Sequence, residues 1–335
     1  MRVYSGILRS YGGVLLGLIV GFASSITLGS LSPAGLSGSL SSLLWVYTSP
    51  SPLIASILFM GPIALSAAGL SIAYRSGFIT VGSEGQVIAG SAAALWLTAI
   101  MDLGLHPLQA FVLASVFSGS IGSLLGLLPA IMRIYLGASE ILSSLMLNYV
   151  VLYIVNYLVS GPWRSGAFPV TKSVPEQYRL GYVDIILISL ATSIALYIIL
   201  SRSRLGLMVE VLGRSPRAAE TYGLRPRLAI YYVSSISGFT AGVGGAVAVL
   251  SFQNSLTPMS IFPGYGYMGA LVAWLSSNNP ILTLPASWFF STLLVYGGAL
   301  QASGLSIGYV LAIQSIIVLS VILFRRITGG GVGYS

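Results

Sequence analysis

Two carboxylates stand inside apolar stretches of the chain, where a charge is costly. Glu84 lies within the segment Gly77-Phe-Ile-Thr-Val-Gly-Ser-Glu-Gly-Gln86. Glu140 starts an apolar stretch in which Glu140, Ser144 and Asn148 recur at four-residue spacing, so that they share one face of a helix. An ionisable group inside a membrane usually faces a cavity or a partner, and it can carry or coordinate an ion. Both carboxylates are therefore candidates for a solute or ion path.

The same residue types also suit a structural role at the start of a helix. Ser83-x-x-Gln86 has the form of a capping box, and Glu84 would then lie in the first helical turn, where the helix dipole favours a negative charge. Ser139 is placed to cap the helix that Glu140 begins. A polar stripe on an intramembrane helix also packs against other helices without lining a path. The sequence leaves both roles open for both carboxylates.

Two interruptions of the apolar pattern mark where a path would run. One is the segment 77–86, and the other is Pro263-Gly264-Tyr265-Gly266-Tyr267. Each follows a long apolar stretch and comes just before a short one. Glycine-broken spans at matching places in two halves predict inverted repeats with the transport path between them, and two ordinary re-entrant turns are the alternative. The candidate path residues are Gly82, Ser83, Glu84, Gln86, Glu140, Asn148, Tyr265 and Tyr267.

A basic segment is the third feature. Residues 202–227 hold eight of the 22 charged residues of the chain, and no further charge follows until Arg325. A basic segment between apolar stretches is typical of a cytoplasmic loop between membrane spans. Inside it a short helix is predicted, with Ser215 as its cap, Pro216 at its first position and Gly223 at its left-handed stop.

Such a short helix is marginal alone in water, so a neighbour is expected to pack on it. Its small contact face is formed by Ala218, Ala219 and Tyr222. Docking of a soluble partner and a position flat on the membrane surface are the two alternatives. Under the first alternative, the contact residues are Gly213, Arg214, Ser215, Pro216, Arg217, Ala218, Ala219, Glu220 and Gly223.

The composition places the rest of the chain in a membrane. Of the 335 residues, 56% are hydrophobic and only 7% are charged, whereas a soluble domain carries about 25% charged residues. The net charge of +8 is therefore an orientation signal and not a nucleic-acid surface. The chain has no cysteine and a single histidine, His106, so we expect no catalytic residues, no metal site and no cofactor.

The apolar stretches predict an all-α polytopic bundle of eight to ten transmembrane spans in a single domain over residues 1–335, with two of the spans broken. The candidate spans are 13–31, 53–73, 86–101, 107–131, 140–160, 182–200, 229–250, 264–277, 280–300 and 306–324. With the N-terminus inside, twelve of the 15 basic residues face the cytoplasm. Both termini and the loop 202–228 are therefore expected inside, and the loops 32–52 and 161–181 outside.

The motifs together resemble those of a known family. Gly77–Gln86 is similar to the "GLFNIGAEGQ" signature of ABC-transporter permeases of the branched-chain amino acid, ribose and nucleoside superfamily, in the form typical of the nucleoside and simple-sugar branch. Glu140–Tyr149 resembles the "EVISTIMLNY" segment of that branch, and Gly213–Gly223 resembles its "GxNPxAAxxxGI" loop. Ser237–Ala246 and Gly264–Ala270 match in character and order.

Two positions depart from the pattern. Thr80 and Ser215 each replace an asparagine, and both keep a side chain that forms hydrogen bonds.

The resemblance implies a permease subunit of an ATP-binding-cassette importer in the plasma membrane. Its partners would be ABC ATPase subunits docked on the loop 202–228, a second and related permease, an extracytoplasmic solute-binding protein and membrane lipid, with no nucleic acid. The residues agree on one point. The chain has no G-x-x-x-x-G-K-[ST] motif and its only lysine is Lys172 in an outer loop, so it does not bind ATP by a P-loop itself.

A nucleoside is the expected solute, because bases stack on aromatic rings and Tyr265, Tyr267 and Trp274 lie near a broken span. Aromatic residues also settle at membrane interfaces without any ligand. A ribose-like sugar or a branched-chain amino acid, carried by the same type of transporter, is the alternative. A secondary transporter driven by an ion gradient is a further one, with Glu84 or Glu140 as the ion carrier.

Overall fold

Helices make up the regular structure of this chain. The computed structural model describes residues 35–302 except for a few positions, together with isolated positions between 304 and 323; the omitted positions within 35–302 are Asp102, Leu103, Tyr222, Met259, Phe262 and Pro263. In these ranges every regular element is a helix, and one isolated bridge joins Arg164 to Thr171. The predicted all-helical class is confirmed. The expected span 13–31 and most of 306–324 lie outside the described residues.

The chain divides into two compact units, which are described separately. One combines residues 1–56 with 291–335, and the other is Ile57–Phe290. In the first unit the helix α2 (Gly35–Thr48) occupies most of the segment 32–52. The segment is therefore a helix where the sequence predicts a loop, because the apolar run Leu43-Leu-Trp-Val-Tyr47 continues the helix beyond its serine-rich start. Its position on the outer side stays a prediction.

Five helices of the described residues are long and apolar enough to cross a membrane. They are α3 (Pro50–Arg75), α5 (Pro107–Leu136), α6 (Glu140–Ser160), α7 (Tyr182–Arg202), which is extended by the 3-10 turn η2 (Glu176–Tyr178), and α10 (Pro226–Ala248), which is extended by the π-helical turn η3 (Val249–Gln253). Their positions agree with five of the predicted spans. A total of eight to ten spans stays a prediction.

Two short helices stand where the broken spans are predicted. The first is α4 (Ser83–Leu95), which continues into a π-helical turn, η1 (Trp96–Ile100). The second is α11 (Tyr265–Leu275). The helix α12 (Thr283–Ala302) follows, close to the predicted span 280–300.

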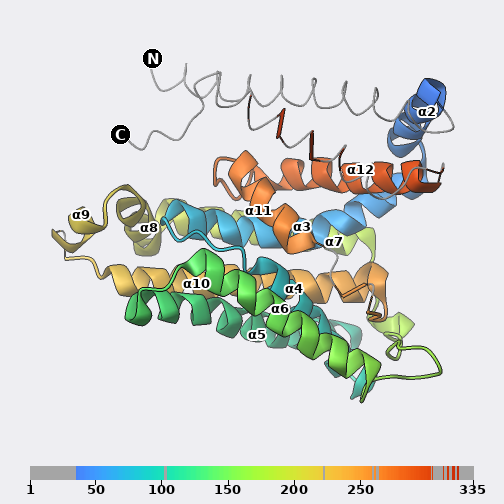
Figure 1. Ribbon diagram of the computed structural model, residues 1–335, viewed down its shortest axis with the longest axis horizontal. Coiled ribbons are helices and arrows are strands. Elements are labelled where there is room, and N and C mark those ends of the chain that lie inside the picture. The colour runs from blue at the N-terminus through green and yellow to red at the C-terminus, as the bar shows by residue number, and fades with distance from the viewer. Residues whose placement is uncertain are drawn as a thin grey trace. The chain divides into compact units, whose positions relative to one another are not determined.

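The short helix α4 is the centre of the larger unit. All of its residues are buried, and it packs against α5 and α10, which lie side by side in Figure 1. Glycine allows this approach: a Cβ on Gly242 of α10 would overlap the carbonyl oxygen of Ser118 of α5. Small residues at helix contacts are typical of membrane bundles, where packing rather than the hydrophobic effect joins the helices.

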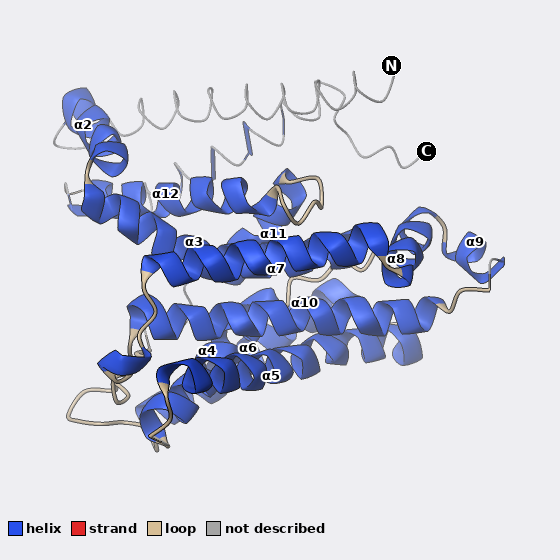
Figure 2. Ribbon diagram, turned by 180° about the vertical axis from the view of Figure 1, so that it is seen from behind, coloured by secondary structure: helices blue, strands red, loops and turns tan. Residues whose placement is uncertain are grey.

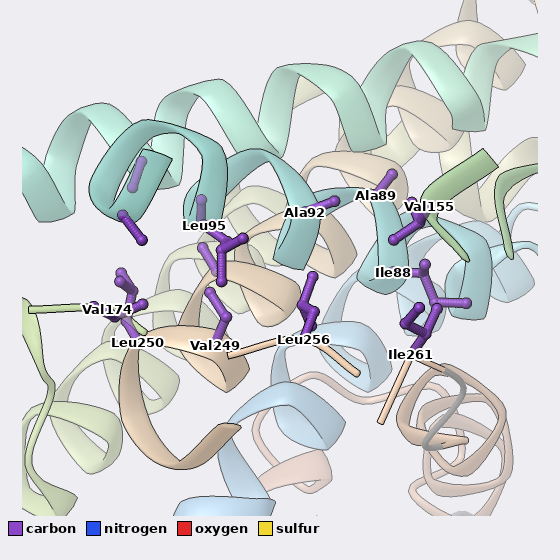
Figure 3. Close-up of a cluster of buried hydrophobic side chains, with 14 of the residues drawn as sticks. Ile88, Ala89, Ala92, Leu95, Val155, Val174, Val249, Leu250, Leu256 and Ile261 are labelled. Carbon is purple, nitrogen blue, oxygen red and sulfur yellow. The ribbon is translucent and has the colours of Figure 1, made fainter. Parts of the chain in front are cut away.

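One side of α4 is covered by apolar side chains from the chain that follows α10. Figure 3 shows α4 facing this segment, with the labelled side chains Ile88, Ala92, Leu95, Val249, Leu250, Leu256 and Ile261. The loop 161–181 holds the same segment in place through backbone hydrogen bonds. The N–H of Val174 donates to the carbonyl of Asn254 at 2.7 Å, and the N–H of Leu180 donates to the carbonyl of Leu250 at 2.8 Å.

The basic residues of the larger unit gather at opposite ends of its long helices. The helices α8 (Arg204–Arg214) and α9 (Pro216–Thr221) lie at one end, and the loop that follows α6 lies at the other (Figures 1 and 2). Arg75 and Arg133 belong to the α8 end, since Gly213 of α8 packs on the backbone of Arg75 and Arg133 reaches the carbonyl of Gly77. This separation has the form that the charge layout predicts. Which end faces the cytoplasm stays a prediction.

Candidate functional site

The two short helices meet at their N-termini through Glu84. The backbone N–H of Gly264 donates to Oε1 of Glu84 at 2.8 Å, and that of Gly266 donates to Oε2 at 2.7 Å. In the opposite direction, the hydroxyl of Ser83 donates to the carbonyl oxygen of Gly266 at 2.9 Å. Ser83 and Glu84 are both 0% exposed. We call these four residues, Ser83, Glu84, Gly264 and Gly266, the helix crossing.

Glycine is required at both α11 positions of the helix crossing. Gly264 has φ of 81°, in the left-handed region that glycine adopts without steric cost. A Cβ on Gly266 would overlap the backbone nitrogen of Glu84. The predicted interruption at 263–267 therefore marks a point where two backbones touch.

The predicted capping box at the start of α4 is wrong. Gly82 is the N-cap residue, and no side chain caps the helix there. Ser83 and Glu84 lie in the first turn of α4, as expected for the glutamate, but their side chains bond to α11. The first N–H groups of any helix lack partners inside the helix, and in a buried place a carboxylate from a neighbouring helix satisfies them.

The polar face of α6 holds the segment before α4. Oδ1 of Asn148 accepts from the N–H of Gly85 at 2.9 Å, and its Nδ2 donates to the carbonyl of Val81 at 2.9 Å and to the hydroxyl oxygen of Tyr267 at 3.1 Å. The hydroxyl of Ser144 accepts from the N–H of Val81 at 3.2 Å. Ser144 and Asn148 thus share one buried face, as their spacing predicts.

Glu140 lies away from the helix crossing. Its Oε1 is 2.8 Å from a guanidinium nitrogen of Arg133, which also donates to the carbonyl of Gly77 at 3.3 Å and lies 5.8 Å from the centroid of the Phe78 ring. Ser139 caps α6 by accepting from the N–H of Leu142, as predicted. Glu140 therefore ties the start of α6 to the loop before α4, and it does not join the other candidate path residues.

The aromatic candidates differ in their surroundings. The ring of Tyr265 lies against two rings of its own chain, stacked on Phe59 with centroids 6.2 Å apart and edge-on to Phe252 at 5.7 Å. Trp274 is 56% exposed and lies edge-on to Tyr74 at 5.9 Å. A base that stacked on Tyr265 would first have to displace these neighbours.

Two glutamines near the helix crossing have buried carbonyl oxygens without a hydrogen-bond partner among the described residues: Gln86 and Gln253. Gln86 lies two residues after Glu84 in α4, and it is one of the candidate path residues of the sequence. Gln253 was not predicted. It lines a crevice between α4 and the segment after α10, together with Val87, Ile88, Ser91, Val155, Leu256, Ser260 and Ile261. The available signal in the sequence was a polar amide within the stretch 228–324, which has no charged residue.

The charged segment contains a helix that the sequence reading missed. Ser203 caps α8 by accepting from the N–H of Gly206 at 3.2 Å, and Val209 and Leu212 are buried. The spacing of these apolar residues was the available signal. Gly213, near the end of α8, packs so closely that a Cβ there would overlap the carbonyl oxygen of Arg75.

The short helix α9 ends as predicted. Gly223 has φ of 72°, its N–H donates to the carbonyl of Glu220 at 2.9 Å, and the N–H of Leu224 donates to that of Ala219 at 3.0 Å. These two bonds form the Schellman motif. Helix α9 packs on α8.

One part of the predicted contact face is wrong. Ala219 is 1% exposed, so it packs inside its own chain and is not available to a partner. Arg214, Glu220, Thr221 and Gly223 are exposed. The side chains of Pro216, Arg217 and Ala218, and the residue Tyr222, lie outside the described part.

These features define a multi-pass membrane protein whose broken helices meet at a buried polar site, which is the arrangement of a transport protein. The chain belongs to the family described as the branched-chain amino acid transport system / permease component, whose model matches residues 53–324. It is therefore a transport component and not a catalytic enzyme.

Individual relatives narrow the branch of the family. The nucleoside ABC transporter permease protein NupB of Lactococcus lactis subsp. cremoris is 26% identical over 70% of this chain and 69% of its own. The guanosine ABC transporter permease protein NupP of Bacillus subtilis is 26% identical over 78% and 77%. The glucose ABC transporter permease protein TsgB13 of Haloferax volcanii is 26% identical over 79% and 75%. No solved structure matches the chain. The resemblance to the nucleoside and simple-sugar branch is confirmed.

Proposed function

We propose that this chain is the membrane-spanning permease subunit of an ATP-binding-cassette importer and that its solute is a nucleoside. The observation that carries the proposal is the helix crossing, a polar contact around the fully buried Glu84 that joins two short helices in a member of a permease family. The names of the nucleoside and guanosine relatives support the solute class. The glucose relative keeps a simple sugar as the second candidate.

We infer that the solute passes beside the helix crossing and along the crevice between α4 and the segment after α10, which is closed even to water in this conformation and would have to widen during transport. The unpaired carbonyl oxygens of Gln86 and Gln253 support this path, because a buried acceptor without a partner is costly and a hydroxyl or N–H of a polar solute would satisfy it. Ser91 and Ser260 add hydroxyl groups along the same crevice. The apolar lining, which includes Ile88 and Leu256, would accept the face of a base.

The energy would enter through α8 and α9. We propose that an ATPase subunit docks on the exposed side of α9, at Glu220 and Thr221. Movement of α9 would pass to α8, on which it packs, and through Gly213 to the end of α3 and the loop that begins at Gly77. That loop leads within seven residues to Glu84. A push on the charged segment would therefore reach the helix crossing by direct contacts.

The remaining partners follow from the same proposal. A second, related permease, two ATPase subunits and an extracytoplasmic solute-binding protein would complete the transporter, with both termini of this chain in the cytoplasm. The two short helices would belong to inverted repeats. In support, α4 and α11 each follow a long helix, and their first turns meet.

An ion-coupled secondary transporter is the rival function. It needs a carboxylate that is free to take up an ion or a proton. Glu84 already accepts two backbone hydrogen bonds, and Glu140 is paired with Arg133. These contacts favour the ATP-driven importer.

Uptake in proteoliposomes that hold the whole complex tests the proposal. We expect labelled guanosine to enter only when ATP reaches the ATPase side, and unlabelled adenosine to compete with it better than ribose, glucose or leucine does. Uptake that survives loss of ATP but stops when the ion gradients are collapsed would support the rival instead. Competition by glucose alone would replace the nucleoside by a sugar.

A further inference from the structure

The helix crossing places the carboxyl group of Glu84 where an anion from outside would also be favoured. The first N–H groups of a helix, together with its dipole, form an anion-binding site. Here the N-terminus of α11 is directed at a carboxylate that stands in the first turn of another helix. Glu84 lies in the first turn of α4 and accepts from Gly264 and Gly266 at the start of α11.

No buried cation accompanies this carboxylate in the described part of the chain. Glu84 is the single charged residue among the buried ones there. The guanidinium of Arg133 is occupied by Glu140 and by the carbonyl of Gly77. Backbone N–H groups and helix dipoles are therefore what would stabilise a charge on Glu84. The N–H groups of Gly264 and Gly266 are occupied by its two oxygens, so they do not bind a second negative charge.

We propose that Glu84 is the resident anion of the helix crossing and that it restricts this permease to solutes without a carboxylate or a phosphate. It acts as a specificity-determining and positioning residue. A negatively charged solute group near the helix crossing would meet the charge of Glu84 in a medium of low dielectric constant, where repulsion is strong. The N–H groups at the start of α11 that would otherwise hold that group are already taken by Glu84.

This inference rests on the proposed function in one respect, namely that the solute passes the helix crossing. It narrows the solute class to neutral polar compounds such as nucleosides and simple sugars. It excludes nucleotides, sugar phosphates and amino acids from the path. A branched-chain amino acid, the alternative solute considered from the sequence, is therefore disfavoured because its carboxylate would be repelled by Glu84.

Chemical rescue tests the resident anion directly. Glu84→Ala removes the carboxylate and leaves space between the two helix N-termini. We expect a lower melting temperature for the purified complex, and we expect sodium formate to raise it by several degrees more than sodium gluconate, whose anion is too large to enter. The wild type and Asn148→Ala, which loses other hydrogen bonds beside the helix crossing, serve as controls and are expected to respond equally to both salts. An equal response of Glu84→Ala would overturn the proposal.

A second measurement applies if Glu84→Ala does not fold. Glu84→Gln keeps the size of the side chain and removes its charge. The infrared difference spectrum between wild type and Glu84→Gln is expected to show the stretching band of an ionised carboxylate. A band of a protonated carboxyl group instead would mean that no anion resides there.

Uptake separates this inference from the proposed function. In the wild-type complex we expect guanosine to enter and guanosine 5′-monophosphate to stay outside, and comparable uptake of both would refute the charge restriction. If formate rescues Glu84→Ala but no nucleoside or sugar is taken up with ATP, the proposed function fails and the resident anion stands. If guanosine enters normally and formate has no selective effect, the opposite holds.

Discussion

Two glutamates with similar sequence surroundings have different tasks because their neighbours differ. Glu84 is fully buried and accepts hydrogen bonds from the backbone of another helix. Glu140 is partly exposed and pairs with an arginine seven residues before it. The first contact joins residues 180 positions apart in the chain, so it constrains the tertiary structure. The second contact closes a local connection between two consecutive helices.

Asn148 provides the residue-scale prediction. Its amide joins α6 to both sides of the helix crossing. Asn148→Ala leaves the N–H of Gly85 and the carbonyl of Val81 without these partners, and each buried group left unpaired costs about 1–3 kcal/mol. We expect a clear drop in the melting temperature of the complex and a loss of most uptake.

The control is another asparagine on the same helix. Asn156 is only half-buried, and its side chain accepts a 3.4 Å hydrogen bond from Ser160. Asn156→Ala is expected to change neither quantity beyond experimental error. Similar losses in both variants would mean that α6 tolerates no shortened side chain at all, and the specific role of Asn148 would be rejected.

At this scale the sequence predicts which residues form polar contacts, but it predicts their partners less well. The four-residue spacing of Ser144 and Asn148 correctly predicts a shared face. The prediction of a capping box at Ser83 and Gln86 is wrong because a short sequence pattern considers only partners within the same helical turn. The actual partners of Ser83 and Glu84 lie about 180 residues further along the chain, and they come into reach only when α4 and α11 are packed together.

At the scale of elements, α8 and α9 pack together into one attachment. Both are short, but α8 is capped by Ser203 and anchored by buried side chains, and α9 packs on it and ends in a Schellman motif. Ala219 contributes to that packing, so an Ala219→Arg variant would disturb α9 itself. Docking is better tested at residues that point away from the chain.

Glu220 is such a residue, and its charge reversal is the second prediction. Glu220→Arg changes the exposed side of α9 without touching a buried contact. We expect the ATPase subunit to bind at least about tenfold more weakly, a loss of about 1.4 kcal/mol, measured by titrating the permease with ATPase subunit in detergent. Membrane insertion is expected to be normal.

Glu176→Arg is the matched control, because Glu176 is 89% exposed on its side chain and lies in the loop at the opposite end of the long helices. Its affinity for the ATPase subunit is expected to equal that of the wild type. Undiminished binding by Glu220→Arg would remove this residue from the docking surface.

Gly213 carries the third prediction, which concerns transmission between elements. A Cβ at this position overlaps the carbonyl oxygen of Arg75, so Gly213→Ala forces α8 away from the end of α3. We expect the ATPase to bind and hydrolyse ATP as before, while ATP-driven uptake falls at least about tenfold. The reason is that overpacking at this contact costs about 1–3 kcal/mol, which α8 avoids by moving away from α3.

Gly166→Ala is the control for this variant, since a Cβ on Gly166 meets no atom within 4 Å. Its uptake is expected to be unchanged. Normal uptake by Gly213→Ala as well would show that the coupling does not run through the contact between α8 and α3.

For the molecule as a whole, the division of basic residues was predicted best. Charge counting needs only the order of polar and apolar stretches, and it separates the α8 end from the end that carries Arg164, Lys172 and Arg179. The helix α2 and the crevice at Gln253 were missed. A serine-rich helix resembles a loop in composition, and a crevice depends on packing between segments that are distant in the chain. The number of spans and the inverted repeats stay predictions.

Orientation in the membrane is the last prediction, and the chain is suited to it because it contains no cysteine. Single cysteines at exposed positions therefore report their side of the membrane without a background. Ser173→Cys lies in the loop 161–181 and Thr221→Cys lies at the end of α9, and both positions are exposed. In intact cells we expect a membrane-impermeant maleimide to label Ser173→Cys at once, because a loop with few positive charges is translocated while the arginine-rich segment stays in the cytoplasm. Thr221→Cys is expected to react only after the membrane is permeabilised, and the cysteine-free wild type not at all. Labelling of Thr221→Cys in intact cells would invert the topology, and with it the assignment of α9 as the surface for a cytoplasmic ATPase.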